Sequence, residues 1–124
     1  MMKKIKEYAK CLCEEDAEIE EVVLIGSFAK GTANDKSDVD LICVFPEELE
    51  DDSNLYRILR ERIQALKRKL MKLEDEIGRF IDLGFIVSTG DIFVRGGLIG
   101  NYQGKYKILI KSKANKGNRD YVNQ

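Results

Sequence analysis

Two carboxylates separated by a single residue precede an apolar segment. Asp38 and Asp40 lead into Leu-Ile-Cys-Val-Phe at 41–45, which is typical of a buried strand. Side chains at i and i+2 of a strand share one face, with Cα atoms about 6.5–7 Å apart. Two carboxylates so placed repel each other and lose hydration unless a cation binds between them. The pair therefore indicates a site for Mg²⁺ or Mn²⁺, the ions that oxygen-only ligands favour; the alternative is a simple turn where the strand begins.

The absence of histidine excludes several classes of enzyme. The 124 residues include 21 basic and 22 acidic side chains, and no histidine. Ser-His-Asp catalysis, Cys-His catalysis and His-ligated zinc all need an imidazole. Cys11 and Cys13 form a C-x-C without a second pair, and we interpret them as structural, with Cys43 buried in a strand. Carboxylates, Lys, Arg, hydroxyls, thiols or a bound ion must carry any chemistry.

A glycine and a serine end the preceding apolar segment. Gly26 and Ser27 follow Glu-Glu-Val-Val-Leu-Ile, so free backbone N–H groups and a hydroxyl meet there, an arrangement that suits phosphate. A P-loop is excluded, because Thr32 and not lysine follows Gly31. Ten residues separate Ser27 from Asp38, so the turn and the carboxylates are expected on neighbouring strands, about 4.8 Å apart. Phosphate beside a divalent ion indicates phosphoryl or nucleotidyl transfer.

Periodicity predicts the elements that position these residues. The expected order is a helix over 3–16, a strand over 20–26, a short helical turn and polar loop over 27–37, a strand over 38–45, one long helix over 55–75 capped by Asp52-Ser53, and strands over 79–87, 91–99 and 105–111, the last two joined by a loop at 100–104. The polar face of the long helix, with Arg60, Lys67, Arg68 and Lys72, is interpreted as solvated.

These elements predict an α/β (α+β) fold. We expect a mixed β-sheet of about five strands, covered by helices on one face. Residues 1–113 are predicted to form a single domain, and the polar residues 114–124 a loose tail. No apolar run reaches the 18 or so residues that span a bilayer, and no signal-like stretch is found, so we expect a cytoplasmic protein without a membrane partner.

The segment 26–45, GSFAKGTANDKSDVDLICVF, resembles the signature of the DNA polymerase beta nucleotidyltransferase superfamily, G-S-x-x-x-G followed by S-D-x-D-L. It is most similar to the minimal nucleotidyltransferases of prokaryotes, and the succession of elements extends the likeness over 20–90. The resemblance implies a nucleotidyltransferase-like fold and a nucleoside triphosphate, with ATP as the first choice. The implied nucleotide-binding residues are Gly26, Ser27, Lys30 and Ser37. Lys30 is equally interpreted as a solvated lysine, and Ser37 as the cap of the turn into Asp38.

The same resemblance implies a third carboxylate on a later strand. Asp82 is the best match, since an acid between apolar strand residues is costly without a cation. Asp91 competes, but it follows Ser-Thr-Gly and suits a turn better. One Mg²⁺ held by Asp38, Asp40 and Asp82 would activate an acceptor hydroxyl. A second ion, held by Asp38 and Asp40, would clamp the triphosphate, and pyrophosphate would leave.

The acceptor needs a binding surface that the catalytic segment does not supply. The resemblance implies a helical partner protein or a homo-oligomer, and some small relatives act as antitoxins. The alternative function is therefore a nucleotide-binding partner or antitoxin module with little or no turnover. Residues 105–124 carry a net charge of +5, and Tyr102 and Tyr106 lie among lysines. The hairpin predicted over 91–111, which contains both tyrosines, suits either RNA or an edge hairpin whose lysines prevent strand pairing.

Overall fold

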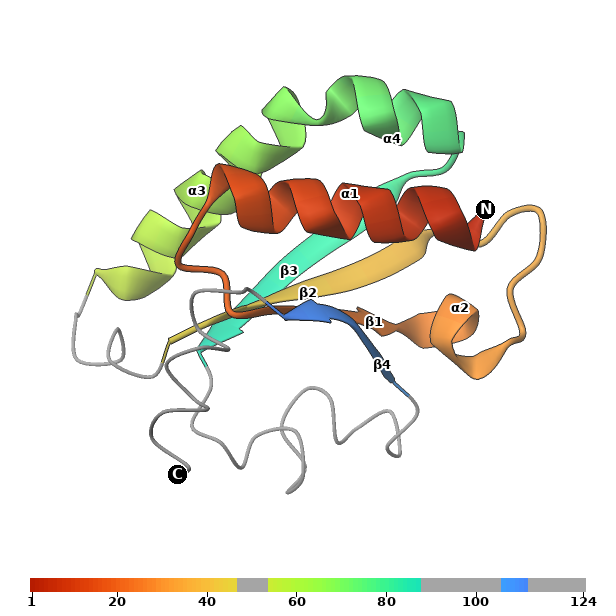
Figure 1. The fold of residues 1–124 in the computed structure, drawn as a ribbon, viewed down its shortest axis with the longest axis horizontal. Coiled ribbons are helices and arrows are strands. Elements are labelled where there is room, and N and C mark those ends of the chain that lie inside the picture. Colours follow the sequence, from red (N-terminus) through yellow and green to blue (C-terminus); the bar gives the residue numbers. More distant parts are fainter. Residues whose placement is uncertain (47–53, 88–105, 112–124) are drawn as a thin grey trace.

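A β-sheet with helices on one side forms the centre of the molecule (Figure 1). The computed structural model describes residues 1–46, 54–87 and 106–111. Its elements are α1 (Met2–Glu15), β1 (Glu21–Ile25), α2 (Gly26–Lys30), β2 (Val39–Phe45), α3 (Leu55–Lys69), α4 (Met71–Ile77), β3 (Ile81–Val87) and β4 (Lys107–Lys111). The predicted strand at 91–99, the loop at 100–104 and the tail at 114–124 lie outside the described residues.

The sheet is mixed, as predicted. Within the described part of the chain it has four strands in the order β3-β2-β1-β4. Strand β1 runs antiparallel to both β2 and β4, whereas β2 and β3 are parallel. A parallel pair needs a long crossover connection, and the chain between β2 and β3 contains α3 and α4. The chain starts of β2 and β3 therefore lie at the same end of the sheet as the chain end of β1.

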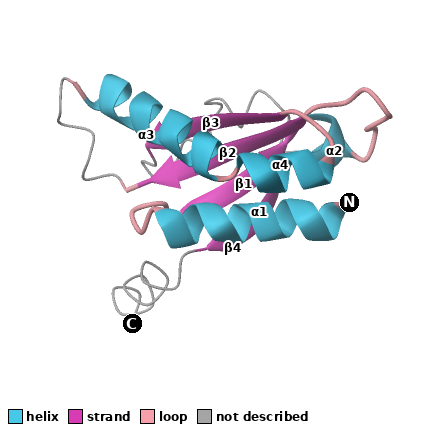
Figure 2. Ribbon diagram, turned by 90° about the horizontal axis from the view of Figure 1, so that it is seen from above, coloured by secondary structure: helices cyan, strands magenta, loops and turns pink. Residues whose placement is uncertain are grey.

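The two faces of the sheet differ. Helices α1, α3 and α4 lie over one face, as the views in Figures 1 and 2 agree. The core beneath them contains Val39, Leu41, Cys43 and Phe45 of β2, and the fully buried Cys43 confirms its predicted place in a strand. Alternate residues of a strand point to opposite faces. Asp40 therefore projects from the face that these three helices leave uncovered.

The predicted helix over 55–75 is wrong in one respect, because it is broken at Leu70. That residue has φ −102° and ψ 16°, and α3 ends before it while α4 begins after it. A straight helix of 21 residues would be about 32 Å long, against about 23 Å for a seven-residue strand. The break keeps α4 over the sheet, where Leu70 and Ile77 are buried. Asn54 is the N-cap of α3, and the predicted cap at 52–53 lies outside the described residues.

Lys67 corrects the prediction that the polar face of this helix is solvated. Its ammonium group donates to Glu74 Oε2 at 3.1 Å and to the backbone carbonyl of Ile81, and it lies 4.3 Å from the ring centre of Phe80. Glu74 Oε2 also accepts the backbone N–H of Ile81 at 2.8 Å. This ion pair therefore ties α3 and α4 to the first residue of β3.

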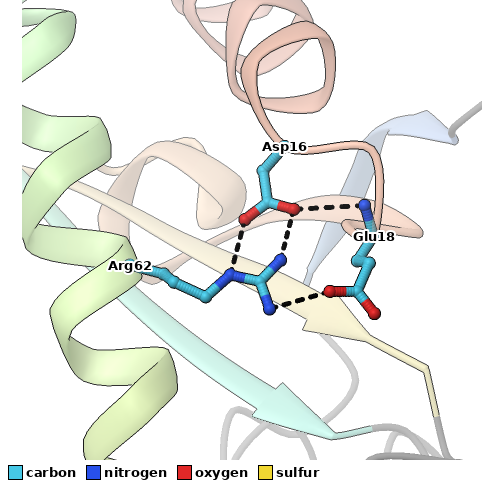
Figure 3. A network of polar contacts seen from close by, with 3 residues as sticks. All are labelled: Asp16, Glu18 and Arg62. Atoms are coloured by element: carbon cyan, nitrogen blue, oxygen red, sulfur yellow. Dashed lines mark hydrogen bonds and ion pairs between the residues drawn. The ribbon is translucent and has the colours of Figure 1, made fainter.

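A second ion-pair network lies at the other end of the sheet (Figure 3). Arg62 of α3 donates from Nε to Asp16 Oδ2 at 2.9 Å, from Nη2 to the other oxygen of that carboxylate, and from Nη1 to Glu18 Oε1 at 2.8 Å. Its guanidinium carbon lies 5.1 Å from the ring centre of Phe45, the last residue of β2. The network joins the end of α1 to α3. None of the described helices is long and apolar enough to cross a bilayer.

Candidate active site

Asp40 and Asp82 lie side by side on the face of the sheet opposite α1, α3 and α4. They are direct partners in the parallel pairing of β2 with β3. Their neighbours along the strands, Ile81 and Leu83 in particular, are buried under the helices, so the two aspartates share the opposite face. Asp38 precedes β2 by one residue and is exposed. The structure therefore brings together the predicted carboxylate pair and the third carboxylate, Asp82; the competing Asp91 lies outside the described residues.

Gly26 fits closely against the Asp40 carboxylate. Ile25 pairs with Asp40 across β1 and β2, which places the next residue, Gly26, beside that side chain. Gly26 has φ +72°, a conformation that disfavours other residues. A Cβ atom added there would lie far inside van der Waals distance of Asp40 Oδ2 and 3.3 Å from its Cγ. Sequence reasoning assigned Gly26 to phosphate binding and missed that it also makes room for a carboxylate.

The three carboxylates influence one another electrostatically. Partial burial raises the pKa of Asp40, and the negative charges of Asp82 and Asp38 raise it further. Among the described residues, none of these acids is in an ion pair. In the same residues, no group of three or more acidic, Cys or His side chains is placed so that together they could hold a metal ion. The match to a divalent ion therefore rests on donor chemistry: Asp38, Asp40 and Asp82 offer only carboxylate oxygens, the donors that Mg²⁺ and Mn²⁺ prefer.

The family model for the nucleotidyltransferase domain matches residues 5–113. The chain belongs to the nucleotidyltransferase domain family. This confirms the resemblance that the Gly-Ser turn and the Asp-x-Asp strand indicated. A search of curated proteins finds no match to the chain.

Solved structures share the fold of this nucleotidyltransferase domain. One is a candidate nucleotidyltransferase from Sulfolobus solfataricus, with 20% identity and a TM-score of 0.51, covering 90% of this chain and 80% of the other. Another is a toxin–antitoxin complex with AMP-PNP, with 16% identity, a TM-score of 0.52, and coverage of 90% and 77%. A third is a variant of the toxin–antitoxin pair MntA–HpeT with two aspartates changed to glutamate, at 15% identity, a TM-score of 0.50, and coverage of 90% and 77%.

The predicted nucleotide-binding residues of the domain flank the carboxylates. Ser27 and Lys30 lie in α2, which starts directly after β1, and Lys30 is exposed in its last turn. The hydroxyl of Ser37 accepts the backbone N–H of Asn34 at 2.8 Å, so it closes the turn before Asp38 as expected. Whether Ser27, Lys30 and Ser37 contact a nucleotide stays a prediction.

Arg79 is a residue near the site that sequence reasoning missed. It follows Gly78 and precedes β3, outside the strand that was predicted to begin at 79. Its Nη1 donates to the backbone carbonyls of Asn34 at 2.7 Å and Ser37 at 2.8 Å. The guanidinium carbon lies 5.1 Å from the ring centre of Phe28 in α2. The sequence signal was weak: a single cation shortly before an acid-bearing strand.

Proposed function

We propose that this nucleotidyltransferase domain is an active Mg²⁺-dependent enzyme that moves a nucleoside monophosphate from a nucleoside triphosphate to an acceptor hydroxyl. One observation carries the proposal: Asp40 and Asp82 are paired in register on the sheet face opposite α1, α3 and α4, no cation compensates them within the described residues, and Gly26 makes room for one of them. Retaining such charges costs stability. A purely structural domain would gain stability by losing them, which favours a catalytic role.

The residues of the site divide into two groups by role. Asp38, Asp40 and Asp82 would hold the metal ions through their carboxylate oxygens. Gly26, Ser27 and Lys30 would contact the triphosphate, and ATP is the proposed donor. When bound, Mg²⁺ would offset phosphate charge and lower the pKa of the acceptor hydroxyl.

The proposed reaction is an in-line displacement at the α-phosphorus. The acceptor oxygen forms a bond to the α-phosphorus as the bond from that phosphorus to the bridging oxygen of the β-phosphate breaks. Pyrophosphate leaves, the hydroxyl proton passes to solvent, and no oxidant or reductant is needed. The exposed Asp82 leaves the carboxylates accessible to an acceptor on this face.

The test is transfer of label from α-³²P-ATP with Mg²⁺. Wild-type protein is incubated with protein, RNA and small-molecule fractions of a cell extract, and transferred label and pyrophosphate are measured. Asp40→Asn is expected to reduce transfer by at least about 100-fold, because it removes a proposed metal ligand. Asp35→Asn is the matched control, since it removes the same charge from an exposed position in the loop before Asp38. Equal transfer by wild type and Asp40→Asn would contradict the proposal.

A second candidate function is a partner-binding module with little or no turnover. It is favoured by the toxin–antitoxin complexes among the structures that share the fold. On this alternative, wild-type protein copurifies with a second protein and Asp40→Asn retains that partner, while neither transfers label. Transfer that depends on Asp40 would decide for the enzyme.

A further inference from the structure

Arg79 links three segments that surround the carboxylates. From the segment leading into β3, it reaches the loop between α2 and β2 through two backbone carbonyls. It also packs against Phe28, which follows Ser27 in α2. The backbone carbonyl of its neighbour Phe80 accepts a hydrogen bond from the N–H of Val39 at 2.9 Å, where β2 begins. The Arg79 side chain therefore contacts α2 and the loop before β2, while the backbone of its neighbour Phe80 is hydrogen-bonded to the start of β2.

The two carbonyls that Arg79 binds belong to a tight turn. Within it, the backbone N–H of Ser37 donates to the Asn34 carbonyl at 3.1 Å, and the N–H of Lys36 donates to Asn34 Oδ1 at 2.8 Å. The Ser37 carbonyl lies in the peptide bond that leads directly to Asp38. Arg79 thus fixes the orientation of the backbone immediately before the first carboxylate.

We propose that Arg79 is a positioning residue that holds the loop 31–38 in the conformation that presents Asp38 and Asp40 to a divalent cation. The inference rests on the proposed function, and it assigns a role that acts through the loop rather than by contact with substrate. A charged donor bound to a carbonyl is worth more than a neutral one, so the two bonds contribute to ordering an otherwise exposed loop.

Arg79 binds uncharged groups, and this affects whether the nearby carboxylates can bind a cation. Arg79 binds neutral carbonyls, and in residues 1–46, 54–87 and 106–111 it forms no ion pair. An arginine paired with Asp38 or Asp40 would compete with a cation for the same oxygens. By binding the backbone instead, Arg79 orders the loop and leaves the carboxylates available.

The experiment measures Mn²⁺ affinity and loop exchange in the full chain. Arg79→Met removes both donors, Arg79→Lys keeps a cation that can reach a carbonyl, and Arg62→Met is the matched control. Arg62 also packs against a phenylalanine ring, at the same 5.1 Å, but at the other end of the sheet. Mn²⁺ binding is followed by the loss of the free-ion EPR signal, and amide hydrogen exchange is followed in metal-free protein.

Arg79→Met is expected to weaken Mn²⁺ binding by about 10- to 100-fold, the usual range for removing a group that orients ligands. Exchange at Asn34, Lys36 and Ser37 is expected to become at least about tenfold faster. Arg79→Lys should recover most of the affinity. Arg62→Met should leave both the Mn²⁺ affinity and the exchange of these three amides near wild type.

Three results would overturn the inference or its basis. Wild-type Mn²⁺ affinity and loop exchange in Arg79→Met would show that Arg79 positions nothing. Normal Mn²⁺ binding and exchange with weakened ATP binding would show direct contact with nucleotide instead. Absence of Mn²⁺ binding by wild-type protein would overturn the proposed function itself, and so is distinguishable from failure of the Arg79 role alone.

Discussion

The two ends of the sheet are each joined to the surrounding helices and loops by an arginine, and the two arginines bind different partners. Arg62 binds the carboxylates of Asp16 and Glu18, whereas Arg79 binds two backbone carbonyls. Each packs against a phenylalanine ring, Phe45 for Arg62 and Phe28 for Arg79. The difference between the two arginines corresponds to a difference between the acids that lie near them. At one end the acids are paired with Arg62. At the other end they have no ion-pair partner among the described residues, and the pKa of Asp40 is raised by burial and by its acidic neighbours.

This contrast shows that an arginine can either stabilise the fold, as Arg62 does, or order the backbone beside a proposed binding site, as we propose for Arg79. Removing one partner of a partly buried ion pair is destabilising, because the other charge is left buried without a partner. The same pairing at the carboxylate site would remove the charges that a cation needs. Mutations near Arg62 should therefore change stability, and mutations near Arg79, at the end that carries Asp40 and Asp82, should change how available these carboxylates are to a cation.

The largest effect is expected from Gly26→Ala, which disrupts the Arg79 end alone. The new Cβ would displace the Asp40 carboxylate, and φ +72° disfavours alanine. Nucleotidyl transfer should fall by at least about 100-fold, and the free energy of unfolding by about 2 kcal/mol. Transfer assays and urea unfolding measure these two quantities.

Gly31→Ala is the control for backbone strain. Gly31 has φ +79°, and an added Cβ would meet nothing within 4 Å. It should lose about 1 kcal/mol of stability with transfer within a few-fold of wild type. If both variants lose transfer equally, backbone conformation and not the space beside Asp40 is decisive.

Arg62→Met should affect the other end alone. It leaves Asp16, whose side chain is only 12% exposed, without its bidentate partner. We expect a loss of about 2 kcal/mol, or on the order of 8 °C in Tm, with unchanged Mn²⁺ affinity. Thermal unfolding followed by circular dichroism measures the loss. A change in Mn²⁺ affinity without loss of stability would mean that the two ends are coupled.

Removing one acid at each end should change stability in opposite directions. Asp40→Asn relieves repulsion from Asp38 and Asp82, so without a divalent ion it should raise the free energy of unfolding by less than about 1 kcal/mol, since solvent screens the charges. Asp16→Asn loses the charge-assisted pair with Arg62 and should lower it by about 1–2 kcal/mol. Paired urea titrations in EDTA test the signs. Destabilisation by Asp40→Asn would contradict the unpaired state of that carboxylate.

The smallest effect is expected from Glu18→Gln. The Glu18 side chain is 49% exposed, and exposed ion pairs contribute little. The loss should be at most about 0.5 kcal/mol at low salt and should vanish near 1 M NaCl, where the Debye length is about 3 Å. Urea unfolding at both salt concentrations checks this, and a loss that persists in high salt would indicate packing rather than charge.

Patterns local in the chain predicted much of this molecule. The apolar run at 41–45 placed Asp38 and Asp40 at the start of a strand, and β2 begins between them at Val39. An acid between apolar residues singled out Asp82, which the structure pairs with Asp40. The boundaries of α1, β1 and β2 lie within one residue of their predicted positions. The family signature covers the same segment, and the matched family model agrees with it.

Contacts between distant residues were not predictable in this way. The apolar stripe continues through Leu70 without glycine or proline, so nothing local marks the break between α3 and α4. The position of Lys67 on the polar face of the helix is typical of a solvated lysine, and only the tertiary structure brings Glu74 and Ile81 to its ammonium group. Arg79 binds carbonyls, which every residue has, so no side-chain pairing in the sequence could reveal its partners.

The register between β2 and β3 links the packing of the core to the position of the proposed metal ligands. Asp40 lies opposite Asp82 only because Ile81 and Leu83 point under the helices, where they are 0% and 9% exposed. A slip of β3 by one residue would turn Asp82 into the core and both apolar side chains into water, at a cost of about 3–6 kcal/mol for their burial alone. Misaligned chains would therefore be unstable as well as inactive. An inserted or deleted residue within β3 should be eliminated by misfolding before selection on catalysis could act.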